Sequence, residues 1–137
     1  MNTTSSSPDR QDILLGGPNE KRMGLARAVR VGNSIAVGGT AAINADGSNV
    51  SASDVEGQAR RCYEIVGQAL AAAGARPTDV VRTRTMLVNI DHYEKVLAAR
   101  KEFLGDTLAA ETIVEVSRFV DPAWQVEIEV DAVIAPR

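Results

Sequence analysis

The sequence contains few of the residues on which several classes of site depend. Its 137 residues include one cysteine and one histidine, Cys62 and His92, which excludes a disulfide framework and a cysteine- or histidine-based metal cluster. We therefore expect no metal and no cofactor. Aromatic residues make up 4% of the chain, and its formal net charge is -3. A general nucleic-acid binder needs a basic surface and aromatic stacking platforms, so we expect no nucleic-acid partner.

Long apolar runs are missing as well. None approaches the length that spans a membrane, so we expect no membrane partner. Residues 1–10 are polar and serine-rich and lack the apolar centre of a signal peptide, which indicates a cytoplasmic location. Residues 1–20 have the composition of a disordered tail, because they can bury too little apolar surface to offset the entropy of ordering. We expect a single domain over residues 21–137.

The clearest strand pattern lies near the C-terminus, between Trp124 and Val133. Apolar and polar residues alternate there, and a period of two is typical of a strand, whose successive side chains point to opposite faces. One face is apolar, and the other presents Glu127, Glu129 and Asp131. These carboxylates form a solvated face unless another subunit covers them. In that case each needs a partner, or its pKa rises.

The remaining elements follow from local patterns. Apolar residues at helical spacing predict a helix over residues 55–73, with Ser53 as a candidate N-cap. A Val- and Thr-rich strand at 80–88 and a helix from about residue 91 to Gly105 follow. Gly32-Asn33 is predicted to be the turn of a β-hairpin.

This order of elements, two strands, helix, strand, helix and two strands, favours one fold class. Strands and helices alternate only in part, and the flanking strand pairs are predicted to be antiparallel. We therefore predict an α+β fold, a mixed β-sheet with two helices packed on one face.

Five segments, taken in order, carry a family resemblance. They are Ala28-Val29-Arg30-Val31-Gly32-Asn33, Gly38-Gly39-Thr40, Ala72-Ala73-Gly74, Thr112-Ile113-Val114-Glu115-Val116 and Asp121-Pro122-Ala123-Trp124-Gln125-Val126-Glu127-Ile128-Glu129. In these segments the chain resembles the Rid family, also called YjgF/YER057c/UK114, whose best-known members are enamine/imine deaminases. The resemblance implies a chorismate-mutase-like α+β protomer. It also implies a homotrimer whose sheets form a central barrel, with ligand clefts between subunits.

The resemblance also points to site residues, and here the sequence departs from the family. Deaminating members bind the substrate carboxylate with an arginine in a Pro-Ala-Arg-Ser segment, and Glu111 stands at that position. Leu25 replaces the family's tyrosine, and Leu97 matches an asparagine of the second helix. Glu127 matches the glutamate that positions water in the deaminases. The chain thus resembles the branch of the family that lacks the arginine.

One hypothesis is a small-molecule hydrolase or proton-transfer enzyme that acts on an enamine, imine or carbonyl compound in an intersubunit cleft. Glu127 and Glu111 would be its catalytic pair, because two neighbouring carboxylates raise the pKa of one of them and so supply an acid and a base. The expected substrate-binding residues, which include two arginines to replace the lost guanidinium, are Arg27, Gly39, Thr40, Leu97, Arg118 and Trp124.

Two other interpretations stay open. The first is a non-catalytic homotrimer that binds a neutral or cationic small ligand, since Glu111 facing inward would repel an anion. In the second, Glu111, Glu127 and Glu129 are structural and pair with arginines of neighbouring strands or subunits, for which Arg82, Arg84 and Arg118 are candidates. Trp124 likewise has two roles open to it, packing in the core or trimer interface and forming a platform for a ligand.

Overall fold

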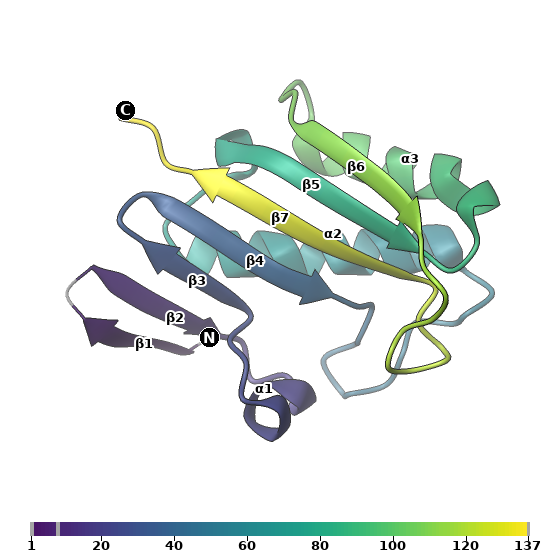
Figure 1. Cartoon of the computed structure of the whole chain (residues 1–137), viewed down its shortest axis with the longest axis horizontal. Coiled ribbons are helices and arrows are strands. Elements are labelled where there is room, and N and C mark those ends of the chain that lie inside the picture. Colours follow the sequence, from purple (N-terminus) through teal and green to yellow (C-terminus); the bar gives the residue numbers. More distant parts are fainter. Residues whose placement is uncertain (1, 8, 137) are drawn as a thin grey trace.

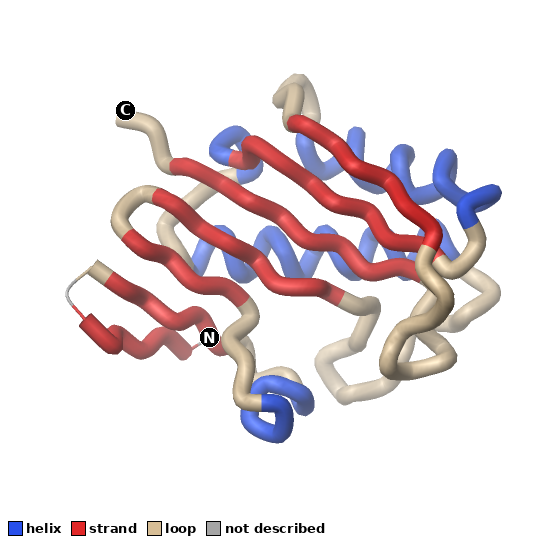
Figure 2. Tube along the Cα trace, in the orientation of Figure 1, coloured by secondary structure: helices blue, strands red, loops and turns tan. Residues whose placement is uncertain are grey.

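The computed structural model describes residues 2–7 and 9–136. In this part of the chain, seven strands form one mixed sheet in the order β1-β2-β3-β4-β7-β5-β6, and two long helices cover one of its faces (Figure 1, Figure 2). The strands are β1 (Asn2–Ser7), β2 (Arg10–Leu14), β3 (Ala28–Val31), β4 (Ser34–Thr40), β5 (Val80–Leu87), β6 (Ala110–Glu115) and β7 (Val126–Val133). The α-helices are α1 (Pro18–Met23), α2 (Val55–Ala72) and α3 (Tyr93–Leu104), and short 3-10 turns span Pro77–Asp79 and Ile90–His92.

The predicted fold class is confirmed. The pairing of β5 with β6 is parallel and the other strand pairs are antiparallel, so the sheet is mixed. Both long helices, α2 and α3, lie on the same face of the sheet, whereas α1 lies at its end, beside the start of β3 (Figure 1). We call the face that α2 and α3 leave uncovered the open face.

Strand β7 forms the centre of the sheet between β4 and β5, as its alternating sequence allows. The side chains of Val126, Ile128, Val130 and Ala132 are at most 1% exposed and contribute to the core under α2. The strand begins at Val126 rather than Trp124, because the preceding residues form a turn in which the Asp121 side chain accepts the Ala123 N–H.

Helix α2 has the apolar stripe that the sequence predicts, and the stripe is buried against the sheet. Its N-cap is Asp54 rather than Ser53. An Asp54 side-chain oxygen accepts the N–H of Gly57 at 2.9 Å, whereas the Ser53 hydroxyl lies 2.8 Å from that of Ser51. The carboxylate therefore satisfies one of the free N–H groups of the first turn.

The N-terminal segment differs from the disordered tail expected for residues 1–20. Strand β2 pairs with β3, the Ile13 side chain is fully buried, and residues 18–20 begin α1. The Glu20 carboxylate accepts the N–H groups of Leu15 and Gly16 at 3.0 and 2.9 Å. The buried side chain of Ile13 and backbone pairing to β3 thus order this segment despite its polar composition. Residues 1 and 8 of the expected tail lie outside the described part.

Candidate functional site

A cavity of about 550 Å³ lies where α1, the end of β4 and helix α2 meet. Its lining comes from residues 15–27, from residues 39–47, from one side of α2 and from residues 120–127. We call it the α1 cavity. Residues 15–20 of this lining belong to the segment that the sequence analysis expected to be disordered, so this part of the wall was missed. Pro18 at the first helical position is a start signal that points to α1.

Arg27 and Glu127 bring opposite charges to the α1 cavity. The Arg27 Nη2 group donates to the carbonyl of Gly39, while its Nε atom is buried and has no hydrogen-bond partner within the described residues. Burial lowers the pKa of Arg27, and the nearby carboxylates of Glu20 and Glu127 raise it. The guanidinium of Arg27 is therefore partly buried and interacts electrostatically with the carboxylates of Glu20 and Glu127.

The Glu127 carboxylate is half-buried in the same cavity. Burial raises the pKa of Glu127, the positive charge of Arg27 lowers it, and the negative charge of Glu129 raises it again. A carboxylate whose pKa is raised holds a transferred proton more readily than an exposed glutamate does. Glu127 is thus a half-buried carboxylate with a raised pKa beside a positive charge.

Two consecutive glycines at the end of β4 leave room for these charged side chains. A Cβ atom on Gly39 would lie 3.2 Å from Oε1 of Glu127, and one on Gly38 would lie 3.2 Å from Nη2 of Arg27. The register of β4 against β7 shifts at this point, between Val37 and Thr40. A bulge made of glycines therefore lets two charged groups approach the backbone.

Trp124 lines the α1 cavity and also belongs to the interior, since it is only 8% exposed. Its indole Nε1 donates to Oδ1 of Asn49 at 2.9 Å, and the Asn49 amide donates to Asp121 at 3.1 Å. The ring is thus fixed in orientation by its polar edge while it forms part of the cavity wall.

Glu111 lies in a different place, on the helix-covered face of the sheet. It is paired with Thr83 of β5, a fully buried residue, whereas Glu127 is paired with Met86 on the open face. Within one protomer the structure does not bring the two predicted catalytic carboxylates together. Their meeting across a subunit boundary stays a prediction.

The surroundings of Glu111 are polar and tightly connected. Its Oε2 atom lies 3.1 Å from Nε of Arg100 and accepts the Thr85 hydroxyl at 3.1 Å, while Oε1 is buried and without a hydrogen-bond partner in the described chain. Arg100 also donates to Thr83 and to the carbonyl of Ala109. Burial raises the pKa of Glu111, whereas the hydrogen bond from Thr85 and the positive charge of Arg100 lower it. The pairing arginine is Arg100, which sequence analysis did not propose.

Three other expected binding residues lie away from the α1 cavity. The Thr40 side chain is fully buried and donates to the carbonyl of Gly38 at 2.8 Å. Leu97 is half-buried on α3, and Arg118 is exposed in the connection between β6 and β7. None of the three is among the residues that line the cavity. Of the expected binding residues, the structure gathers Arg27, Gly39 and Trp124 around Glu127.

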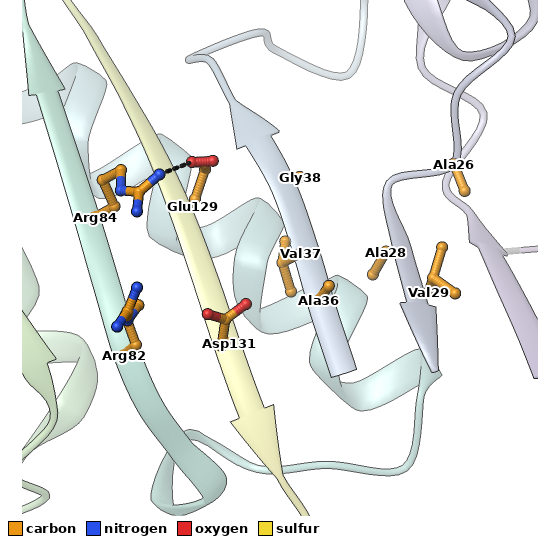
Figure 3. Close-up of a pocket in the computed structure, with 10 residues that line it drawn as sticks. All are labelled: Ala26, Ala28, Val29, Ala36, Val37, Gly38, Arg82, Arg84, Glu129 and Asp131. Atoms are coloured by element: carbon orange, nitrogen blue, oxygen red, sulfur yellow. Dashed lines mark hydrogen bonds and ion pairs between the residues drawn. The ribbon is translucent and has the colours of Figure 1, made fainter. Parts of the chain in front are cut away.

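The open face of the sheet carries a second, shallower hollow of about 400 Å³. Figure 3 shows the arginines of β5, Arg82 and Arg84, beside the acidic residues of β7, Glu129 and Asp131. Arg84 Nη1 lies 3.4 Å from Oε1 of Glu129. For Glu129 this agrees with the structural interpretation, in which a charged strand face is paired across strands.

Neither a metal centre nor a membrane span is found in the part of the chain that the structure describes. Residues 2–7 and 9–136 contain no group of three or more His, Cys, Asp and Glu residues placed to hold a metal ion. No described helix is both long enough and apolar enough to cross a membrane.

Comparison with known proteins places the chain in a family. The family model of endoribonuclease L-PSP matches residues 20–134. The chain therefore belongs to the endoribonuclease L-PSP family, also called YjgF/YER057c/UK114, and the resemblance to Rid proteins is confirmed.

Individual relatives agree with this assignment. The RutC family protein PYRAB12510 of Pyrococcus abyssi is 31% identical over 93 residues, 68% of this chain and 73% of the relative. The crystal structure of Rv2704 from Mycobacterium tuberculosis is 32% identical, covers 91% of this chain and 99% of its own, and has a TM-score of 0.81. The structure of E. coli TdcF with bound serine has a TM-score of 0.75 at 21% identity, over 90% of this chain and 94% of its own. That last likeness is one of fold. Membership of the family supports a role in processing or binding small molecules.

Proposed function

We propose that this protein is a small-molecule hydrolase or proton-transfer enzyme that acts on an enamine, imine or carbonyl compound in the α1 cavity. The observation that carries the proposal is the Glu127 carboxylate, half-buried beside Arg27 at the end of a glycine bulge. Burial raises the pKa of Glu127, so its ionised form is a stronger base than an exposed glutamate.

For an imine, the reaction needs a water molecule and a relay of protons through Glu127. Glu127 accepts a proton from water while the water oxygen bonds to the imine carbon, and the carboxylic acid then returns the proton to the nitrogen, which gives an amino alcohol. The hydroxyl proton of the amino alcohol then passes through Glu127 to the nitrogen as the carbon–nitrogen bond breaks, and ammonia and a carbonyl compound are released. Arg27 stabilises the ionised form of Glu127 before the first proton transfer and after the last, because its charge lowers the pKa of that carboxyl.

The proposal includes a homotrimer in the cytoplasm, with the α1 cavity completed by a neighbouring subunit. An intersubunit cleft is the arrangement that the family resemblance implies. In such a cleft Glu111 of one subunit and Glu127 of another would form the catalytic pair. Sedimentation analysis of the full chain tests the assembly, since a monomer would contradict it.

A second candidate is a non-catalytic trimer that binds a neutral or cationic small ligand. It is favoured by Glu111, which stands where deaminating members carry their carboxylate-binding arginine and is here engaged by Arg100. A protein that lost turnover would keep the cavity and its charge.

Imine hydrolysis separates the two candidates. We would generate 2-aminoacrylate and the neutral imine of benzaldehyde in situ and measure ammonia release above the spontaneous rate. The enzyme hypothesis expects acceleration of at least one compound and its loss in Glu127→Gln. The matched control is Glu94→Gln, an exposed position on α3 outside the cavity. Background rates with both compounds would leave the binding protein as the better description.

A further inference from the structure

The charges around the α1 cavity restrict what it accepts. We infer that the cavity selects uncharged substrates that carry a carbonyl or imine acceptor, and that it disfavours free carboxylates. The inference rests on the proposed function, since it names the substrate class of the same site, and it follows from three features of the lining.

The first feature is that both cationic side chains of the described lining are already engaged. Arg61 donates from Nε to the carbonyl of Ile43 at 2.9 Å and from Nη1 to Glu64 at 3.1 Å. Arg27 donates to the carbonyl of Gly39, and the negative charges of Glu20 and Glu127 act on its guanidinium and raise its pKa. Strong carboxylate recognition by arginine uses two parallel N–H donors of one guanidinium. Each of these arginines already spends donors on the protein itself.

The second feature is the balance of formal charge. Three carboxylates, Glu20, Asp46 and Glu127, line the cavity against the two guanidiniums of Arg27 and Arg61. With all of them ionised, the lining carries a net charge of one negative unit, from three acids and two bases. An anionic ligand would lose its hydration and meet this negative charge at close range, which is costly.

The third feature is a donor that lacks an acceptor. Arg27 Nε is buried without a hydrogen-bond partner in the described chain, and such a group costs free energy until an acceptor is supplied. Nε is fully covered in the described structure, so an acceptor reaches it only after a small shift of the neighbouring side chains. A neutral carbonyl oxygen or imine nitrogen that does so removes this cost without adding negative charge. The apolar side chains of Leu25, Ile65 and Trp124 line the cavity and provide contact for the rest of such a molecule.

Pyruvate and pyruvamide test the inference, because they share a keto group and differ in charge. Titration of the full-length protein with each, followed by calorimetry or ligand-observed NMR, should give a dissociation constant about tenfold lower for pyruvamide. Glu127→Gln removes one negative charge. In this variant the difference between the two dissociation constants should become smaller, mainly because pyruvate binds more tightly. Glu94→Gln should keep the wild-type ratio, because it lies on the exposed first turn of α3.

Arg27→Gln provides an independent variant. It should weaken the binding of pyruvamide about tenfold through loss of the guanidinium donor. Arg60→Gln changes an exposed position of α2 and should not change the binding of either ligand. Retained stability of Arg27→Gln in urea shows that the loss of binding is local. If Arg27→Gln does not fold, the inference is tested by the ratio of the dissociation constants of pyruvate and pyruvamide, measured on the wild type and on Glu127→Gln.

Equal or tighter binding of pyruvate to the wild-type protein would overturn the inference, and so would failure of both ligands to bind. These outcomes are distinct from failure of the proposed function, which is read from ammonia release. If the protein prefers pyruvamide but hydrolyses no imine, the inferred selectivity holds and the proposed enzymatic function fails. If it hydrolyses 2-aminoacrylate through Glu127 but prefers pyruvate, the enzymatic function holds and the inferred selectivity fails.

Discussion

Glu127 and Glu111 are the same residue type on the same sheet, and burial raises the pKa of both, yet their surroundings differ. Glu111 is held by Arg100 and Thr85 under α3. The side chain of Glu127 has no hydrogen bond to any described residue and lines a cavity beside Arg27. A carboxylate bound to the protein on several sides stabilises the fold, whereas one left free beside a counter-charge is available to a ligand. Within one protomer we therefore expect Glu111 to contribute to stability, whereas Glu127 is available to a ligand.

The largest expected effect is on turnover. Glu127→Gln should lower imine hydrolysis by about 100-fold or more, as expected for removal of a general base. The free energy of unfolding should stay close to the wild-type value, because no described hydrogen bond is broken. Steady-state kinetics and urea titration on the same preparation measure both. Similar turnover in wild type and Glu127→Gln would remove Glu127 from the mechanism.

The complementary change should act on stability. Glu111→Ala leaves the Arg100 guanidinium, whose side chain is 14% exposed, without its ion partner. Breaking such a pair from one side should cost about 2 to 4 kcal/mol of unfolding free energy. Urea denaturation measures this cost. Glu102→Ala removes a partner of Arg60 that is 65% exposed and should cost under about 1 kcal/mol. Equal losses in the two variants would contradict the structural role of Glu111.

A smaller effect is expected where the backbone approaches Glu127. In Gly39→Ala the added Cβ would lie 3.2 Å from Oε1 of Glu127, so the carboxylate must shift. Turnover should fall about tenfold through misplacement of the base. A double-mutant cycle with Glu127→Gln provides the check, since Gly39→Ala should have little further effect once the carboxylate is absent. Full additivity would show that the glycine acts independently of Glu127.

The subtlest difference is in pH dependence. Folding raises the pKa of Glu127 above its ordinary value of 4.5. At pH values between the unfolded and the folded pKa, the folded state therefore binds more protons than the unfolded state. The contribution of Glu127 to stability should therefore decrease as pH rises through the raised pKa, and Glu127→Gln should lack this decrease. Turnover should rise over the same window as the base ionises. Urea titrations of both proteins across pH 4 to 8, about the range in which a raised glutamate pKa falls, provide the measurement.

The parts of this molecule that the sequence predicts well are those specified by local periodicity. Strand β7 and helix α2 follow from alternation and from three-four spacing, since each buries one face against the other. The N-terminal wall of the α1 cavity does not follow in this way, because its order depends on pairing with β3 and on the single anchor Ile13.

The site itself is predicted only in part. Arg27, Gly39 and Glu127 were expected to act together, and they line one cavity, though their roles remain proposals. The face on which Glu111 lies depends on the register of β6 against β5, and its partner Arg100 comes from a helix that the sequence places only approximately. Register and helix position are set by tertiary packing, so no local pattern identifies that pair.

The α1 wall has a consequence for how this fold diversifies. A six-residue helix and the loop before it are tied down chiefly by the Glu20 carboxylate, and they stand outside the β7–α2 core. Exchanging this short stretch would reshape the mouth of the cavity and alter its charge while the sheet register remains intact. A family built on this plan can therefore acquire new ligand preferences through its leading segment, without rebuilding its centre.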